Sequence, residues 1–133
     1  MASPRARLLS LLFLLPVLAA VGCTGGAGDA TADIKAEFKL QPDPPRVGPA
    51  DVTLLLTDKD GKPVKGATLK LEGNMNHAGM KPEFADAKEV EPGKYEAKLE
   101  LTMGGDWYVE VTGNLSDGRK LKKKFDVPGV KSR

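Results

Sequence analysis

Short segments of alternating apolar and polar residues constrain this chain more than any other feature of its sequence. Such alternation places successive side chains on opposite faces of a β-strand, and Gly, Pro, Asn or Asp bounds each segment. No segment has a convincing helical period, so the chain is expected to be all-β. The predicted strands are residues 34–40, 51–57, 67–72, 84–90, 94–103, 107–112 and 120–127.

About seven short strands within residues 34–128 are typical of an immunoglobulin-like antiparallel β-sandwich, and this length suits one small domain. The proline-rich segment 41–45 has to be an extended connection or an edge, because proline lacks the backbone donor. Residues 58–63 combine aspartates with a glycine, which is typical of a turn. Tyr95 follows another glycine turn, and we expect its hydroxyl to close a corner by bonding the backbone.

The start of the chain has the composition of an export signal and not of a folded domain. Arg5 and Arg7 precede an apolar run, residues 8–20, that is too short for a membrane span. Small residues then lead to Cys23. The pattern resembles the bacterial lipoprotein signal, in which residues 1–22 are removed and the cysteine is lipidated. The alternative is an ordinary secretory signal that leaves Cys23 as a free thiol.

Cys23 is the only cysteine, so no intramolecular disulfide can form and stability has to come from packing. Lipid on Cys23 would anchor the protein to a membrane on the outer side of the cytoplasmic boundary. Residues 23–33 are small, polar and glycine-rich after the cysteine, as in a flexible linker, and residues 129–133 are expected to form a tail. Thr24 is not the aspartate that resembles an inner-membrane retention signal, which favours the outer membrane in a Gram-negative cell.

The charge balance argues against a nucleic-acid partner. The chain carries 20 Lys and Arg against 18 Asp and Glu, and the numbers become equal once Arg5 and Arg7 leave with the signal. No aromatic-basic binding pattern is present either. Catalysis is not indicated, because His77 has no nearby serine or cysteine nucleophile and the carboxylates alternate with lysines. We therefore expect a monomeric protein that is not an enzyme.

The basic segment 119–125 has two interpretations. Its lysines could lie against anionic lipid head groups. They could instead protect an edge strand from pairing with another chain, and we favour this second interpretation.

Soft metal ligands gather in two short segments. Met75, His77 and Met80 lie in an Asn- and Gly-rich stretch that we expect to connect two strands at one end of the sandwich. Met103 lies four residues before Trp107, the only tryptophan. Thioether and imidazole donors select Cu(I) over harder divalent ions. Met75 and His77 would point the same way in an extended chain, and the glycine after them permits a turn that returns Met80.

The two segments are expected to meet through a hairpin. A loop of residues 104–106 would oppose Met103 to Trp107 and Leu101 to Val109, so that the apolar faces match. The sequence thus predicts a Cu(I) site of the loop donors, with Met103 as a possible further ligand and Trp107 as a shield. Core packing remains the alternative explanation, because a methionine against an indole is a favourable contact.

The sequence from Asp51 to Val127 resembles the YtkA-like family of small exported or membrane-tethered domains, which is related to the FixH-like proteins. The resemblance implies an immunoglobulin-like sandwich without enzymatic activity. It also implies a copper-handling partner, because family members occur near copper efflux components and FixH-like relatives are associated with assembly of copper oxidases. The donor set resembles, in chemistry alone, periplasmic Cu(I) chaperones in which a tryptophan lies over the metal. The residues that carry the resemblance to the YtkA-like family are Met75, His77, Met80, Gly93, Lys94, Tyr95 and Met103 to Trp107.

We therefore expect a membrane-tethered extracytoplasmic protein that holds or passes a soft metal ion, Cu(I), through its Met/His loop. The alternative is a non-metal interaction or assembly module that docks on an envelope partner. Such a module would use the same end loops or a sheet edge.

Overall fold

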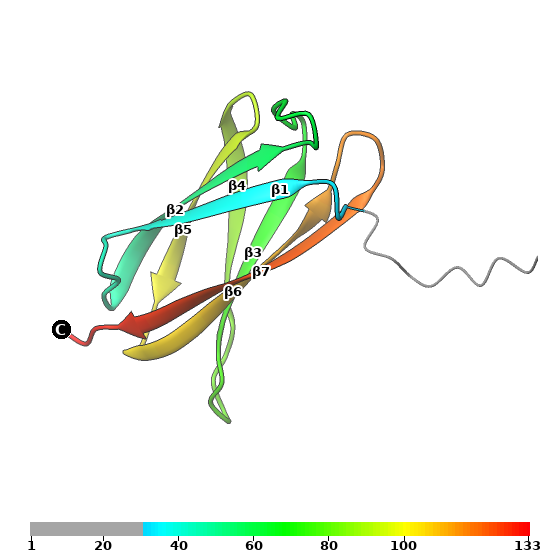
Figure 1. Ribbon diagram of the computed structural model, residues 1–133. Coiled ribbons are helices and arrows are strands. Elements are labelled where there is room, and N and C mark those ends of the chain that lie inside the picture. Colours follow the sequence, from blue (N-terminus) through cyan, green and yellow to red (C-terminus); the bar gives the residue numbers. More distant parts are fainter. Residues whose placement is uncertain (1–30) are drawn as a thin grey trace, which may run out of the picture.

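The computed structural model describes residues 31–133, which contain seven antiparallel strands (Figure 1). The predicted signal at residues 1–22, Cys23 and the linker as far as residue 30 lie outside the described residues. Each strand overlaps a segment predicted from the alternation. The part of the chain that the structure describes holds no helix capable of spanning a bilayer. The strands are β1 (Lys35–Gln41), β2 (Gly48–Thr57), β3 (Thr68–Met75), β4 (Glu83–Glu91), β5 (Lys94–Leu101), β6 (Gly105–Asn114) and β7 (Lys120–Val130).

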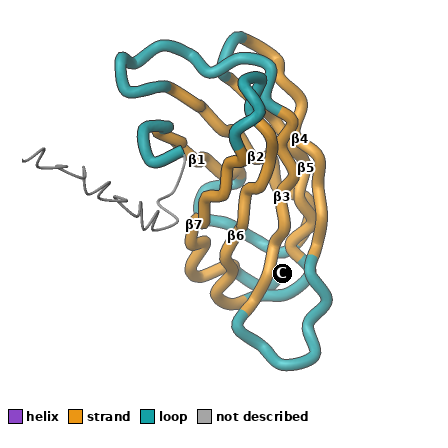
Figure 2. The backbone as a smooth tube through the Cα atoms, turned by 90° about the vertical axis from the view of Figure 1, so that its right-hand side faces the viewer, coloured by secondary structure: helices purple, strands orange, loops and turns teal. Residues whose placement is uncertain are grey.

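The strands pair in the order β1-β2-β5-β4-β3-β6-β7. β4 belongs to both halves of this order, because residues 83–87 pair with β3 and residues 88–91 pair with β5. The halves β1-β2-β5-β4 and β3-β6-β7 reproduce the two sheets of a constant-type immunoglobulin domain. The predicted immunoglobulin-like sandwich is therefore confirmed, and its connections gather at the two ends of the strands (Figure 2).

The predicted hairpin between β5 and β6 is wrong. β5 pairs with β2 and β4, whereas β6 pairs with β3 and β7, so the chain crosses between the two sheets at residues 102–104. Leu101, Trp107 and Val109 are all buried, as predicted. Matching apolar faces could not reveal the error, because two strands bury the same faces whether they pair or face each other across a sandwich.

The two sheets pack directly on each other. A Cβ placed on Gly73 in β3 would lie 3.1 Å from Cδ2 of Leu99 in β5, so the layers approach closely at the glycine. β1 and β7, the two ends of the pairing order, do not pair, but the Phe38 ring in β1 stacks on the Phe125 ring in β7 with centroids 4.8 Å apart. This contact joins the first and last strands of the pairing order. β7 is an edge strand, in agreement with the interpretation of its lysines.

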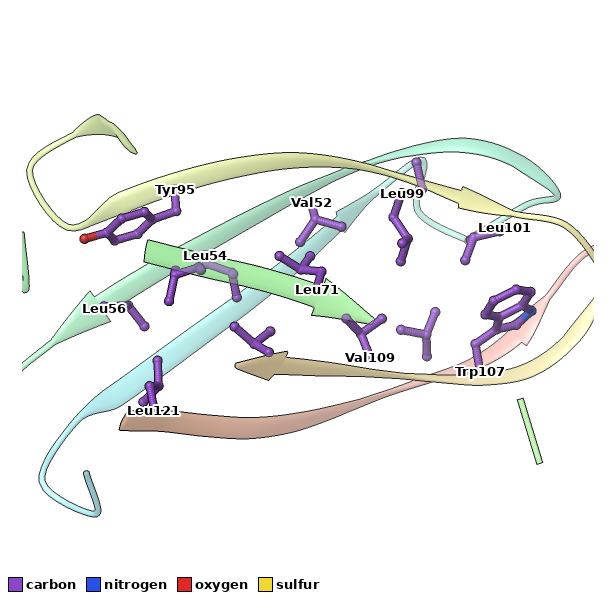
Figure 3. Packing of buried hydrophobic residues seen from close by; sticks show 14 of the residues in the cluster. Val52, Leu54, Leu56, Leu71, Tyr95, Leu99, Leu101, Trp107, Val109 and Leu121 are labelled. Atoms are coloured by element: carbon purple, nitrogen blue, oxygen red, sulfur yellow. The ribbon is translucent and has the colours of Figure 1, made fainter. Parts of the chain in front are cut away.

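Tyr95 lies at one end of the core and Trp107 at the other (Figure 3). The Tyr95 hydroxyl donates a hydrogen bond to the Val64 carbonyl at 2.7 Å and accepts one from the Ala67 amide at 3.1 Å. Burial raises the pKa of Tyr95 to about 12. The predicted structural role of this tyrosine is confirmed, because its hydroxyl fixes the connection between β2 and β3.

Glu89 reinforces the same end of the sandwich. Its Oε2 accepts hydrogen bonds from the Gly66 amide at 3.1 Å and the Gly93 amide at 3.4 Å. Interaction with the Tyr95 hydroxyl, together with these two amides, lowers the pKa of Glu89. Gly93 has a φ of 75°, and a Cβ there would lie 2.7 Å from Cβ of Pro63, so the tight turn requires glycine.

Some residues that the sequence assigned to the linker and the tail have defined structure. Residues 31–33 form a turn in which the Thr31 carbonyl accepts a hydrogen bond from the Ile34 amide at 2.9 Å. At the other end β7 continues to Val130, and Lys131 forms a parallel bridge with Arg46. The C-terminal residues therefore pack against the connection between β1 and β2.

Replacing Tyr95 with phenylalanine should lower the free energy of unfolding by about 1–2 kcal/mol, because the Val64 carbonyl and Ala67 amide both lose their partner. Urea unfolding measures the change. Tyr108→Phe is the control, since the ring under the Lys124 ammonium group is kept and the expected change is below about 0.5 kcal/mol. Equal losses in the two variants would contradict the role assigned to Tyr95.

The lowered pKa of Glu89 predicts a pH-dependent contribution to stability. The Glu89 carboxyl group binds a proton less tightly in the folded state than in the unfolded state. Its contribution to stability is therefore fully present above the unfolded pKa and is lost as pH falls through the folded pKa. Urea midpoints of the wild type and Glu89→Gln should therefore differ at pH 7 and converge in acid. If the two urea midpoints differ by the same amount at every pH, the ionised Glu89 carboxylate does not contribute to stability in this way.

Candidate metal site

All the predicted metal donors lie at one end of the sandwich. This end, here named the Met/His end, carries the connections of residues 42–47, 76–82 and 102–104 together with the C-terminal residues. The 76–82 loop extends beyond the strands at the bottom of Figure 1. The opposite end is the one closed by Tyr95.

Met75 is the last residue of β3 and not part of the loop, where the sequence placed it. It is 7% exposed and pairs in register with Trp107 of β6. A Cβ placed on Gly105, whose φ is 125°, would lie 2.9 Å from the Met75 methyl carbon Cε. The glycine therefore leaves the space that this methyl group fills. Met75 is the deepest of the sulfur donors.

Trp107 links the two donor segments. The residue is 2% exposed, and its indole N–H donates a hydrogen bond to the Met103 carbonyl at 2.8 Å. This bond fixes the backbone of the β5–β6 connection beside the end of β3. The Met103 side chain itself is 47% exposed, so it does not fill the core opposite Trp107 as the predicted hairpin required.

His77 and Met80 lie in the loop between β3 and β4. His77 is exposed, whereas Met80 is half-buried and packs against the core. The Met80 amide donates a hydrogen bond to the His77 carbonyl at 3.5 Å, so the turn that the glycine was expected to permit is present. The loop thus offers one imidazole in solvent and one thioether close to the protein surface.

Together, the donors form a series that runs from the core to solvent. Met75 is innermost, Met80 is intermediate, and His77 and Met103 are exposed. Within residues 31–133 no group of three or more His, Cys, Asp or Glu side chains is placed to share a metal ion. A site at this end would therefore be built mainly on thioether sulfur, which suits Cu(I).

Sequence reasoning missed one exposed aromatic residue near the loop. Phe84 is 62% exposed at the start of β4, four residues after Met80. Ala85 and Ala87 on the other face of β4 pack against the core, so Phe84 has to face solvent. The alternation in β4 contained this signal, because small side chains occupy one face and Phe84 lies on the other.

The chain is similar to one protein family and to solved structures of low sequence identity. The model of the family described as YtkA-like matches residues 30–112. A search of curated proteins found no significant match. A structure of murine CRIg has a TM-score of 0.42 and 14% identity, covering 74% of this chain and 98% of that one. MtrC from Shewanella baltica OS185 has a TM-score of 0.45 and 13% identity, covering 74% of this chain and 22% of that one.

The different depths of the methionines can be tested through stability. Met75→Ala should lower the free energy of unfolding by about 2–4 kcal/mol, because it opens a cavity beside Trp107. Met103→Ala removes an exposed side chain and should change it by less than about 0.5 kcal/mol. Urea unfolding followed by Trp107 fluorescence distinguishes the two. Equal effects would contradict the placement of Met75 in the core.

Proposed function

The chain belongs to the YtkA-like family, and we propose that its domain holds or passes a soft metal ion, Cu(I), at the Met/His end. Met75, His77 and Met80 would bind the ion, and Met103 would supply a further thioether. Trp107 would shield the bound ion on the core side. The ion is a cargo in this proposal, and the domain has no catalytic role.

One observation carries the proposal, namely the convergence of the two donor segments on Trp107. Met75 is the register partner of Trp107, and the Trp107 indole bonds the backbone of Met103. The donors are distant in sequence, yet the fold brings both segments to one tryptophan. Thioether, imidazole and indole are a chemically coherent set for Cu(I) and a poor set for Mg²⁺ or Ca²⁺, which take oxygen ligands.

The graded exposure of the donors suits acquisition and release of the ion. His77 and Met103 can meet a metal complex in solvent, whereas Met75 and Met80 lie against the protein. An ion could therefore be captured by the exposed donors and then exchange onto the inner ones. Exchange of this kind needs ligands that are few and weak enough to be replaced by those of a partner.

We also propose that the domain works outside the cytoplasm, tethered through lipidated Cys23, and that it meets a copper-handling envelope protein. The described chain begins at Thr31, whose carbonyl accepts a hydrogen bond from the Lys123 ammonium group at 3.2 Å. This entry point lies at the end opposite the Met/His end (Figure 1). A tether there would direct the Met/His end away from the membrane.

A docking module without metal is the second candidate function. Phe84 and Met103 are both large exposed apolar side chains, 62% and 47% exposed, and either could contact an envelope partner. In that case sulfur would have no special role. Leucine at the methionine positions would preserve the surface.

Anaerobic titration with Cu(I) against a competing chelator tests the proposal. The domain from residue 30 onward should bind Cu(I) stoichiometrically with a change in Trp107 fluorescence. The double variant Met75→Leu with Met80→Leu keeps size and apolarity but removes sulfur, and it should lose at least about tenfold in affinity. Asn76→Ala, which alters the same loop without removing a soft donor, is the control and should bind as the wild type does.

Unchanged Cu(I) binding in the leucine variant would show that the ion binds elsewhere. No binding above the chelator background by the wild-type domain would contradict the metal proposal. The docking module would then become the leading account.

A further inference from the structure

Three cationic residues lie side by side at the Met/His end. Arg46 and Lys131 form a parallel β-bridge, in which the Val47 amide donates to the Lys131 carbonyl and the Lys131 amide donates to the Pro45 carbonyl, both at 2.9 Å. The C-terminal residues are thus held against the β1–β2 connection by backbone hydrogen bonds. The positions of these two cations are set by the fold.

Arg133 joins the same face. Partners in a β-bridge project their side chains to the same side, and residues two apart on an extended chain do so as well. The Arg133 atom Nη2 is 3.5 Å from the position of a Cβ on Gly48, which lies two residues after Arg46. The Arg133 guanidinium therefore lies beside the backbone of Gly48. Arg46, Lys131 and Arg133 form what we name the cationic cluster.

No salt bridge among the described residues neutralises the cationic cluster, although the Asp106 carboxylate is nearby, where its Oδ1 accepts a hydrogen bond from the Gly129 amide at 2.8 Å. None of its three members forms an ion pair there, whereas Lys122 pairs with Glu110 on the neighbouring sheet face. Like charges held close together repel one another, so the cluster slightly destabilises the protein when no partner is bound. An anionic surface would relieve that repulsion when it binds.

The cationic cluster borders the proposed metal site. A Cβ placed on Gly104 would lie 2.6 Å from Oγ of Ser132, the residue between Lys131 and Arg133. Gly104 follows Met103, whose side chain is 47% exposed. By the same alternation, Ser132 faces the β5–β6 connection, whereas Lys131 and Arg133 face the β1–β2 connection. The cations and the exposed thioether therefore lie at the same end of the sandwich, on the two sides of the C-terminal segment. A partner that covers the C-terminal segment would contact both.

We infer that the cationic cluster docks an acidic protein surface and thereby places that partner's metal against Met103 and the Met/His loop. The inference rests on the proposed function, since it names the partner class for the same site. A protein partner fits better than a membrane because the chain enters at Thr31, at the opposite end (Figure 1). Charge complementarity would raise the rate of encounter more than the final affinity for metal.

The test compares two triple variants of residues 24–133, the exported chain without lipid. The first carries Arg46→Gln, Lys131→Gln and Arg133→Gln. The control carries Lys59→Gln, Lys62→Gln and Lys65→Gln, which removes the same charge from the connection at the opposite end. Fluorescent poly-glutamate serves as a metal-free acidic probe, and an anionic Cu(I)–bicinchoninate complex serves as a metal donor.

The cluster variant should bind poly-glutamate roughly tenfold more weakly than the wild type at low salt, and the control should lose much less. The cluster variant should also take Cu(I) from the anionic complex several-fold more slowly than the wild type does. High salt should slow the wild type by about the same factor, because salt screens the same charges. The equilibrium affinity of the cluster variant for Cu(I) should not change. If the wild type does not bind Cu(I), the proposed function is contradicted, but the poly-glutamate measurement still tests the cationic cluster.

Equal losses in both triple variants would overturn the inference, because net charge alone would explain them. Unchanged poly-glutamate binding in the cluster variant would also overturn it. Sedimentation with phosphatidylglycerol vesicles separates the remaining possibility. Cluster-dependent binding to these vesicles without binding to poly-glutamate would assign the cations to a lipid surface and reject the protein partner.

Discussion

Burial of one face of every strand against the opposite sheet is the constraint on which the rest of this structure depends. The only cysteine is Cys23, so no disulfide supports the domain, and its surface ion pairs join exposed side chains that contribute little. Stability therefore comes from inward-facing aliphatic residues packed between two layers. The two-residue period of the sequence is the direct expression of that requirement.

The fixed core leaves its two ends free to differ. Tyr95 and Trp107 each direct a polar atom of a buried ring to the backbone of a connection, which the tyrosine holds at Val64 and the tryptophan at Met103. At the Tyr95 end, Glu89 and backbone amides complete a structural network. At the other end the connection held by Trp107 exposes a thioether. The same device thus closes one end and presents potential ligands at the other.

The sequence predicted much of the fold because periodicity and turn residues act locally. The strands, the edge position of β7 and the role of Tyr95 followed from alternation, lysines and a glycine turn. The pairing of β5 with β6 did not follow, because inward faces are the same for neighbours and for strands across the core. No local pattern specifies that β4 changes partner between Ala87 and Lys88, or that its register with β5 shifts between Glu89 and Glu91.

The residues of the candidate site could be named from the sequence, but their arrangement could not. Spacing brought Met75, His77 and Met80 into one segment, yet only the register with Trp107 shows that Met75 ends a strand inside the core. The cationic cluster was invisible in the sequence, because Arg46 and Lys131 are far apart along the chain and meet through a bridge of backbone atoms. Contacts between distant segments are set by the whole topology.

The most direct test of the metal site is NMR of the domain with ¹³C-labelled methionine methyl groups during addition of Cu(I). Each methionine of residues 31–133 gives its own signal, so every thioether is observed separately. The account predicts that the Met75, Met80 and Met103 signals shift together and saturate at one equivalent. Signals that do not shift, or that shift without saturation, would contradict a built thioether site at this end of the sandwich.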